Sequence, residues 1–253
     1  MKLDKKRILS AAAILATVLA VLWSGYHNQG TPLSSSAASS NMHPTSVASL
    51  AGTAVNSETV TIDFSSLQTQ NPDIYAWITI PGTIVNYPVV QKMDAADPYD
   101  NYYLNHTVDF TEGYPGAIYS HPVNALDFTD PVTVLYGHNM KDGSMFSCLH
   151  EFENKDFFDQ NPMVIIDTPD YTYTYEIFAE VTFSDALLTY DYDFSTPKEV
   201  RRYLDDLKSC KGNFNENIEV TEQDKLLTLS TCFADQDSLR LLLIGVLTEK
   251  TKH

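Results

Sequence analysis

The chain has 253 residues, of which 33 are acidic and 16 are basic, and its formal net charge is −17. This charge argues against nucleic acid and anionic membrane surfaces as partners, because both are polyanions. A polar, low-complexity beginning leaves one folded domain of roughly 190 residues, long enough to bury a sizeable core. Many short β-type runs and 15 tyrosines indicate a mainly β protein.

The first part of the chain has the pattern of a membrane anchor. Residues 1–7 include four basic side chains, and an uncharged apolar run follows over residues 8–23. Trp23 and Tyr26 lie where interfacial aromatics flank a span, and no small-residue cleavage site follows directly. We therefore expect a cytoplasmic tail over residues 1–7 and an uncleaved single-pass anchor over residues 8–26, with the rest of the chain extracellular. A cleaved signal peptide is the alternative.

The next segment, residues 27–58, is rich in Ser, Ala, Thr and Gly and has no apolar period. This composition predicts a flexible extracellular tether, followed by a folded domain over residues 59–253.

Short elements fill the first two thirds of the domain. Asp63 is placed to cap a helix over residues 64–70. The predicted strands are apolar or β-branched runs at 76–80, 84–90, 116–119, 132–136, 163–167 and 171–183. The last of these alternates aromatic and polar residues, as a half-exposed strand does. A helix is predicted at 144–152, and shorter helical turns are predicted at 101–106 and 156–158.

A long connection precedes the last two predicted strands. It begins with a polar, Tyr-rich stretch at residues 189–193. Thr196 then suits an N-cap and Pro197 the first turn of a helix over residues 197–208. The apolar residues of this helix follow the spacing i, i+3, i+4, i+7, at Val200, Tyr203, Leu204 and Leu207.

The end of the chain carries a candidate nucleophile. Residues 226–232 and 240–247 are apolar runs of strand length, joined by a polar connection at 233–239. Strands joined by a short loop normally pair as a hairpin, which would bring Cys232 and Arg240 to one end of a sheet. A thiol beside a fixed positive charge can become a thiolate nucleophile. The missing base is offered by His138, directly after the strand at 132–136.

These segments together resemble the sortases. The run Thr-Leu-Ser-Thr-Cys at 228–232 has an Arg eight positions on, and Tyr-Gly-His-Asn-Met stands at 136–140. More narrowly, the chain resembles class B sortases, the cysteine transpeptidases of Gram-positive cell envelopes, from about residue 63 to residue 247. The resemblance implies a closed sortase-type β-barrel with N-terminal helices and a helix in the long connection before the cysteine strand. It implies no metal and no organic cofactor.

The resemblance also assigns three catalytic residues. Cys232 would be the nucleophile and His138 the acid and base, while Arg240 would bind substrate carbonyls and the oxyanion. The alternatives are a buried structural cysteine, a satisfied histidine and a surface salt bridge. The other six histidines, which include His106, His121 and His150, have no such sequence context.

The roles of several further residues are left open by the sequence. Ser230 and Thr231 flank the thiol and either line the substrate groove or are ordinary strand residues. Tyr136 and Asn101 match positions near the class B substrate pocket. Asn139 either orients His138 or caps a turn. Phe233 stands where class B members often carry an acidic or polar residue.

The two remaining cysteines, Cys148 and Cys210, show no zinc-type spacing with the third. A disulfide between them is one possibility, and two small buried side chains are the other.

The expected protein is a membrane-anchored cysteine transpeptidase. It would cleave a C-terminal sorting motif of secreted proteins after Thr, through a thioacyl enzyme, and join the product to an amine of the cell-wall precursor. A pilin polymerase that uses a lysine amine is the alternative within the family. A non-catalytic surface-binding module and a plain cysteine peptidase are the alternatives outside it. The resemblance favours Asn over Leu at the first position of the motif, Asn-Pro-x-Thr.

Overall fold

The computed structural model describes residues 62–253, so the expected tail, anchor and tether at 1–7, 8–26 and 27–58 lie outside the described residues. The strands are β1 (Ile74–Thr79), β2 (Asn86–Val90), β3 (Ile118–Tyr119), β4 (Val132–Tyr136), β5 (Met163–Asp167), β6 (Tyr171–Ser184), β7 (Gly212–Phe214), β8 (Leu226–Phe233) and β9 (Gln236–Lys252). The helices are α2 (Phe64–Gln70), α3 (Lys155–Gln160), α4 (Leu188–Asp191) and α5 (Pro197–Lys208), with 3₁₀ turns η1 (Tyr102–Leu104) and η2 (Ser147–Glu153). No helix among these is long and apolar enough to cross a membrane.

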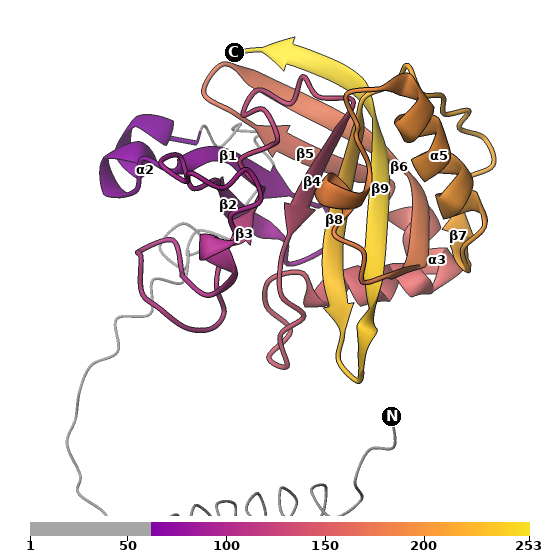
Figure 1. Ribbon diagram of the computed structural model, residues 1–253, viewed down its shortest axis with the longest axis horizontal. Coiled ribbons are helices and arrows are strands. Elements are labelled where there is room, and N and C mark those ends of the chain that lie inside the picture. Colours follow the sequence, from indigo (N-terminus) through magenta and orange to yellow (C-terminus); the bar gives the residue numbers. More distant parts are fainter. Residues whose placement is uncertain (1–61) are drawn as a thin grey trace, which may run out of the picture. The chain divides into compact units, whose positions relative to one another are not determined.

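Eight of the described strands close into a barrel (Figure 1). Their order is β5-β1-β2-β3-β4-β8-β9-β6, and β6 pairs back with β5. The long strand β6 makes this closure possible, because its first half pairs with β5 while its second half pairs with β7. The predicted closed, mainly β barrel is therefore confirmed, with β7 as an additional edge strand.

The local sequence explains two features at the start of the domain. The Asp63 side chain accepts a hydrogen bond from the Ser66 N–H at 3.1 Å and so caps α2. Between β1 and β2 the chain turns at Gly82, whose φ of +84° favours glycine. A side chain there would also collide with Asn161, whose Oδ1 lies 2.0 Å from the position of a Cβ.

The helix α5 covers the outer face of the barrel. Thr196 caps it by accepting from the Glu199 N–H at 3.4 Å, and all four residues of the predicted apolar stripe are buried. Successive strand residues point to opposite faces. Accordingly, Leu227 and Leu229 of β8 belong to the core inside the barrel, whereas Leu226 packs with α5 in a second core outside it.

This second core explains one wrong prediction. Residues 177–181 of β6 are buried in succession, although the sequence predicted a half-exposed strand. The alternation of β6 holds only over its first half. Further along, Phe178 and Val181 meet the core under α5 while Ile177 faces the barrel interior, so both faces are covered.

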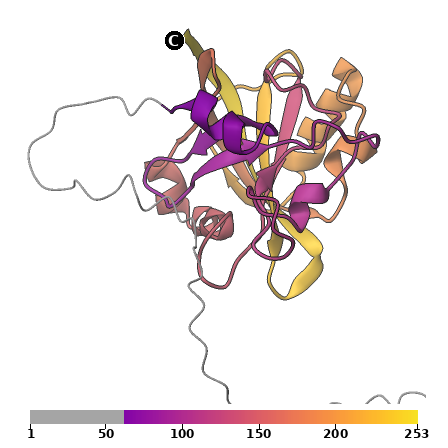
Figure 2. The same cartoon turned by 90° about the vertical axis from the view of Figure 1, so that its left-hand side faces the viewer.

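Other differences come from short segments with strong tertiary contacts. The predicted turn at 156–158 is the helix α3, capped by the Asn154 side chain and anchored by buried Phe158. The stretch at 189–193 overlaps the helix α4. The connection predicted at 233–239 shrinks to two residues, because β9 begins at Gln236. Figure 2 shows η2 and α3, in pink, on a different side of the barrel from α5, in orange.

Candidate active site

Cys232 lies directly opposite Arg240 in the antiparallel β8–β9 pair. Residues so paired have Cβ atoms about 4.5–5.5 Å apart and share a face of the sheet. That face is the outer one, because Thr228, four residues before the cysteine, bonds the Tyr203 hydroxyl of α5 at 2.9 Å. The ladder becomes irregular directly after Cys232. The thiol therefore lies half-buried on the outer face, near the tip of the last hairpin.

The strand β4 brings His138 to the same edge. β4 runs parallel to β8, with Tyr136 level with Ser230, and the Gly137 N–H donates to the Ser230 carbonyl at 3.2 Å. Extending this register by two residues sets His138 level with Cys232. Figure 1 shows β4 and β8 ending at the same side of the barrel as the β8–β9 hairpin tip. Three neighbouring strands thus deliver an imidazole, a thiol and a guanidinium to one edge.

The contacts of His138 define its tautomer. Its Nε2 lies 2.8 Å from the Leu104 carbonyl, and the Tyr114 ring packs at a centroid distance of 5.0 Å. A carbonyl oxygen can only accept, so Nε2 carries a proton. Nδ1 is consequently the nitrogen that can take up or release a proton.

The Arg240 guanidinium folds back onto the hairpin tip. Its Nη1 donates to the carbonyls of Asp237 and Leu239, both at 2.8 Å. Within residues 62–253 no carboxylate forms an ion pair with it, so the structure gives no support to a surface salt bridge. The Nε and Nη2 donors have no hydrogen-bond partner in this part of the chain and can donate to an oxygen atom of a ligand.

The four candidate substrate-binding residues occupy different places. Ser230 lies on the face of β8 that carries Cys232, whereas Thr231 points to the opposite face, and both are buried. Tyr136 packs against the rings of Tyr119 and His121, at 5.4 and 4.5 Å, and burial raises its pKa to about 12. Asn101 is exposed and begins the η1 turn, which ends at the Leu104 carbonyl that holds His138.

Two residues that the sequence did not single out as a pair touch the cysteine. The amide nitrogen of Asn139 and the Nε2 atom of His150 lie 3.0 and 3.1 Å from the Cys232 carbonyl oxygen. Asn139 makes no hydrogen bond to His138, the role that the sequence left open for it. His150 comes from η2 and lies 82 positions from Cys232, so no local pattern could have indicated this contact.

A buried polar pair lies beside Tyr136. The Nδ1 atom of His121 lies 2.8 Å from the Thr189 hydroxyl of α4, and burial lowers the pKa of His121 to about 4. This imidazole is therefore neutral near pH 7. Thr189 also lines a cavity of about 240 Å³ together with Tyr99 and Tyr190.

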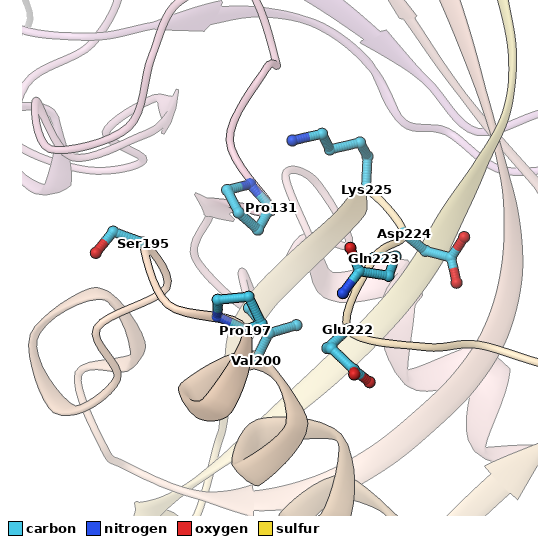
Figure 3. Close-up of a pocket in the computed structure, with 8 residues that line it drawn as sticks. All are labelled: Pro131, Ser195, Pro197, Val200, Glu222, Gln223, Asp224 and Lys225. Carbon is cyan, nitrogen blue, oxygen red and sulfur yellow. The ribbon is translucent and has the colours of Figure 1, made fainter.

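A second, smaller cavity of about 150 Å³ lies away from the thiol. Figure 3 shows it between Pro197 and Val200 of α5 and residues 222–225, which lead into β8. Lys225 directly precedes β8 and Cys232 lies near the far end of that strand, roughly 23 Å away at about 3.3 Å per residue. This cavity therefore takes no part in the cluster of Cys232, His138 and Arg240.

All three cysteines are free, so Cys148 and Cys210 are not joined in a disulfide. Cys148 is buried, and burial raises its thiol pKa. Burial also raises the thiol pKa of half-buried Cys210, and the nearby carboxylate of Asp206 acts in the same direction. Both shifts disfavour a thiolate at these two positions.

Comparison with known proteins places the chain in a family. The sortase domain model matches residues 78–248. Sortase B of Listeria monocytogenes is 33% identical over 79% of this chain and 79% of its own length, and sortase B of Staphylococcus aureus is 31% identical over 69% of each. The crystal structure of Clostridium perfringens sortase B is 28% identical and superimposes with a TM-score of 0.65, over 74% of this chain and 100% of that one. The chain therefore belongs to the sortase family of cell-envelope cysteine transpeptidases, and within it to class B.

Proposed function

We propose that Cys232, His138 and Arg240 are the catalytic residues of this sortase. The observation that carries the proposal is the placement of all three at one edge of the barrel. Cys232 stands opposite Arg240, and the β4–β8 register continues to His138. The free donors of Arg240 and the open Nδ1 of His138 support the same roles.

The reaction follows from these atoms. The Cys232 sulfur attacks the carbonyl carbon of a Thr residue in the substrate while the thiol proton passes to Nδ1 of His138. Nε and Nη2 of Arg240 donate to the oxyanion of the tetrahedral intermediate. The C–N bond then breaks, the departing amine takes the proton from Nδ1, and a thioacyl enzyme remains.

A second amine completes the transfer. It attacks the thioester carbonyl and gives its proton to Nδ1, and the sulfur leaves and takes that proton back. The net reaction exchanges one amide for another and consumes no cofactor. The proposed acceptor is an amine of the cell-wall precursor, and the proposed donor is a secreted protein with a C-terminal sorting signal.

The proposed substrate motif is of the Asn-Pro-x-Thr type. One support is that the relatives are class B sortases. The other is the polar pair of Thr189 and His121, whose imidazole packs against the ring of Tyr136. The Thr189 hydroxyl pairs with His121 and has capacity for a further hydrogen bond, which a polar first residue can use and a Leu cannot. The proposed location is the outer face of the cell membrane, held by residues 8–26.

The test is an assay of the full-length protein with a quenched peptide that carries the motif, without an acceptor, with triglycine, or with a lysine-containing peptide. We expect a triglycine adduct, and loss of it in Cys232→Ala. Hydrolysis that is insensitive to added amine would indicate a plain peptidase. Transfer only to a lysine side chain would indicate a pilin polymerase, and absence of any thiol-dependent product would indicate a non-catalytic module.

A further inference from the structure

Three polar side chains, Asn139, His150 and Glu153, form a cluster next to the backbone carbonyl of Cys232. Asn139 and His150 both approach the Cys232 carbonyl, at 3.0 and 3.1 Å, and they are 3.0 Å from each other. Nδ1 of His150 lies 2.7 Å from the carboxylate of Glu153, three residues on in η2. The group thus connects the loop after β4, the turn η2 and the end of β8.

The partners of each atom fix most of the hydrogen positions. The Glu153 carboxylate can only accept, so Nδ1 of His150 donates to it. The Asn139 amide nitrogen lies 3.0 Å from both the Cys232 carbonyl oxygen and Nε2 of His150, and it donates to the carbonyl, while Nε2 lies 3.1 Å from the same carbonyl oxygen. A flipped Asn139 amide would set its oxygen against the Cys232 carbonyl oxygen and is excluded.

Asn213 anchors the end of η2, the turn that carries His150 and Glu153. Nδ2 of Asn213, in β7, donates to the carbonyls of Phe152 and Glu153 at 2.8 and 3.0 Å, which fixes the end of η2. It also lies 3.3 Å from the carboxylate of buried Glu180 in β6. The ring of Phe233, directly after the cysteine, packs edge-on against His150 at 4.9 Å.

We propose that Asn139, His150 and Glu153 form a positioning network, which holds the backbone carbonyl of Cys232 and thereby aims its sulfur at the substrate. The regular β8–β9 pairing ends with Cys232, because the register shifts between Cys232 and Phe233, so strand pairing restrains the Cys232 backbone on its N-terminal side only. The hydrogen bond from the Asn139 amide to the Cys232 carbonyl supplies a restraint that the strand pairing does not give. The inference rests on the proposed role of Cys232 as the nucleophile.

Two substitutions of one residue separate a positioning role from a packing role. His150→Phe keeps the ring volume and the contact with Phe233 but removes both nitrogens. His150→Gln loses the ring but can place a polar atom near the position of Nε2. We expect kcat to fall by about 10- to 100-fold in the Phe variant, with KM within about two-fold of wild type, and to recover largely in the Gln variant.

The network also predicts that the effects of substitutions at Asn139 and His150 on kcat are not additive. Asn139→Ala should lower kcat to a similar extent, and the Asn139→Ala, His150→Phe double variant should be no worse than the poorer single variant, because both act through one carbonyl. Asp159→Asn is the matched control. It breaks a surface ion pair with Lys155 four residues away, on the helix that follows η2, and should leave kcat unchanged.

A spectroscopic readout is independent of turnover. The dipeptide Cys-Phe occurs once in the chain, at 232–233. Labelling the full-length protein with carbonyl-¹³C cysteine and ¹⁵N phenylalanine therefore gives a single cross-peak that reports the Cys232 carbonyl. We expect its ¹³C shift to move upfield in His150→Phe and Asn139→Ala, and to stay close to wild type in His150→Gln and Asp159→Asn.

Wild-type kcat and an unmoved carbonyl shift in His150→Phe would overturn the inference, as would a Gln variant that is more damaged than the Phe variant. Failure of the proposed function has a different signature. It would appear as full transpeptidation by Cys232→Ala, whatever the carbonyl resonance does in the His150 variants.

Discussion

Cys232 and Arg240 face each other across the β8–β9 pair, on the outer surface of the barrel. The pairing fixes the distance between the two backbones, while the Arg240 side chain is tied to the hairpin tip through Nη1 alone. One hairpin therefore supplies both the proposed nucleophile and the proposed oxyanion donor. The proposed base, His138, follows β4, the parallel neighbour of β8.

Removing the nucleophile or the base should abolish transpeptidation without unfolding the domain. Cys232 and His138 are both half-buried, so Cys232→Ala and His138→Ala create no large core cavity. We expect activity at the background level in each variant, with circular dichroism and Tm close to wild type. Substantial turnover by either folded variant would remove that residue from the proposed mechanism.

Arg240→Lys should be almost as damaging as Arg240→Ala. Lysine keeps the charge but lacks the planar fork, so it cannot bond the hairpin carbonyls through one nitrogen and an oxyanion through the others. The expected loss in kcat/KM is about 10²- to 10³-fold for both, as for removal of an oxyanion donor. A Lys variant with near wild-type kcat/KM would reduce the role of Arg240 to its charge.

The buried carboxyl of Glu180 should make stability depend on pH. Burial raises its pKa from 4.5 to about 7, so between these values the folded state binds more protons than the unfolded state. The contribution of Glu180 to stability is then fully present below about pH 4.5 and is lost as pH rises through about 7. Glu180→Gln, which cannot ionise, should gain stability relative to wild type over this window, by on the order of 1–3 kcal/mol. Urea unfolding of both proteins at a series of pH values measures the difference, and a difference that is constant with pH would contradict the prediction.

Much of the fold could be predicted because it depends on local patterns. The capping residue Thr196, the stripe of α5 and the pairing of Cys232 with Arg240 all follow from short-range spacing. The double-sided burial of β6 could not be predicted, because it depends on where α5 docks. The contact of His150 with Cys232 likewise joins residues far apart in sequence, and nothing near His150 distinguishes it from the other histidines.

The expected anchor gives a topological prediction. Protease treatment of intact protoplasts should remove the folded domain and leave a small membrane-bound fragment that contains residues 8–26. The physical reason is that the four basic residues before the apolar run favour retention of the N-terminus inside the cell. A mature protein whose N-terminal sequence begins near Ala38 would show instead that the segment is a cleaved signal peptide.

The proposed motif preference can be measured by competition. Two quenched peptides that differ only in Asn or Leu at the first motif position are mixed at equal concentration. We expect about 10- to 100-fold preference for Asn, which corresponds to about 1–3 kcal/mol for the hydrogen bonds that an Asn side chain makes in the pocket and a Leu side chain cannot. Thr189→Val, which removes the hydroxyl, should reduce the preference for Asn over Leu. Equal cleavage, or preference for Leu, would contradict the proposed substrate class.

The proposed mechanism requires a thioacyl enzyme, and the residue that carries the acyl group can be mapped. The full-length protein is mixed with a motif peptide without an acceptor amine, quenched in acid, and mapped by mass spectrometry. The peptide's acyl fragment, ending in Thr, should be found on Cys232, and its amount should fall when triglycine is added before the quench. An acyl group mapped to Cys210 or Cys148, or an adduct on Cys232 that does not respond to the amine, would contradict the account.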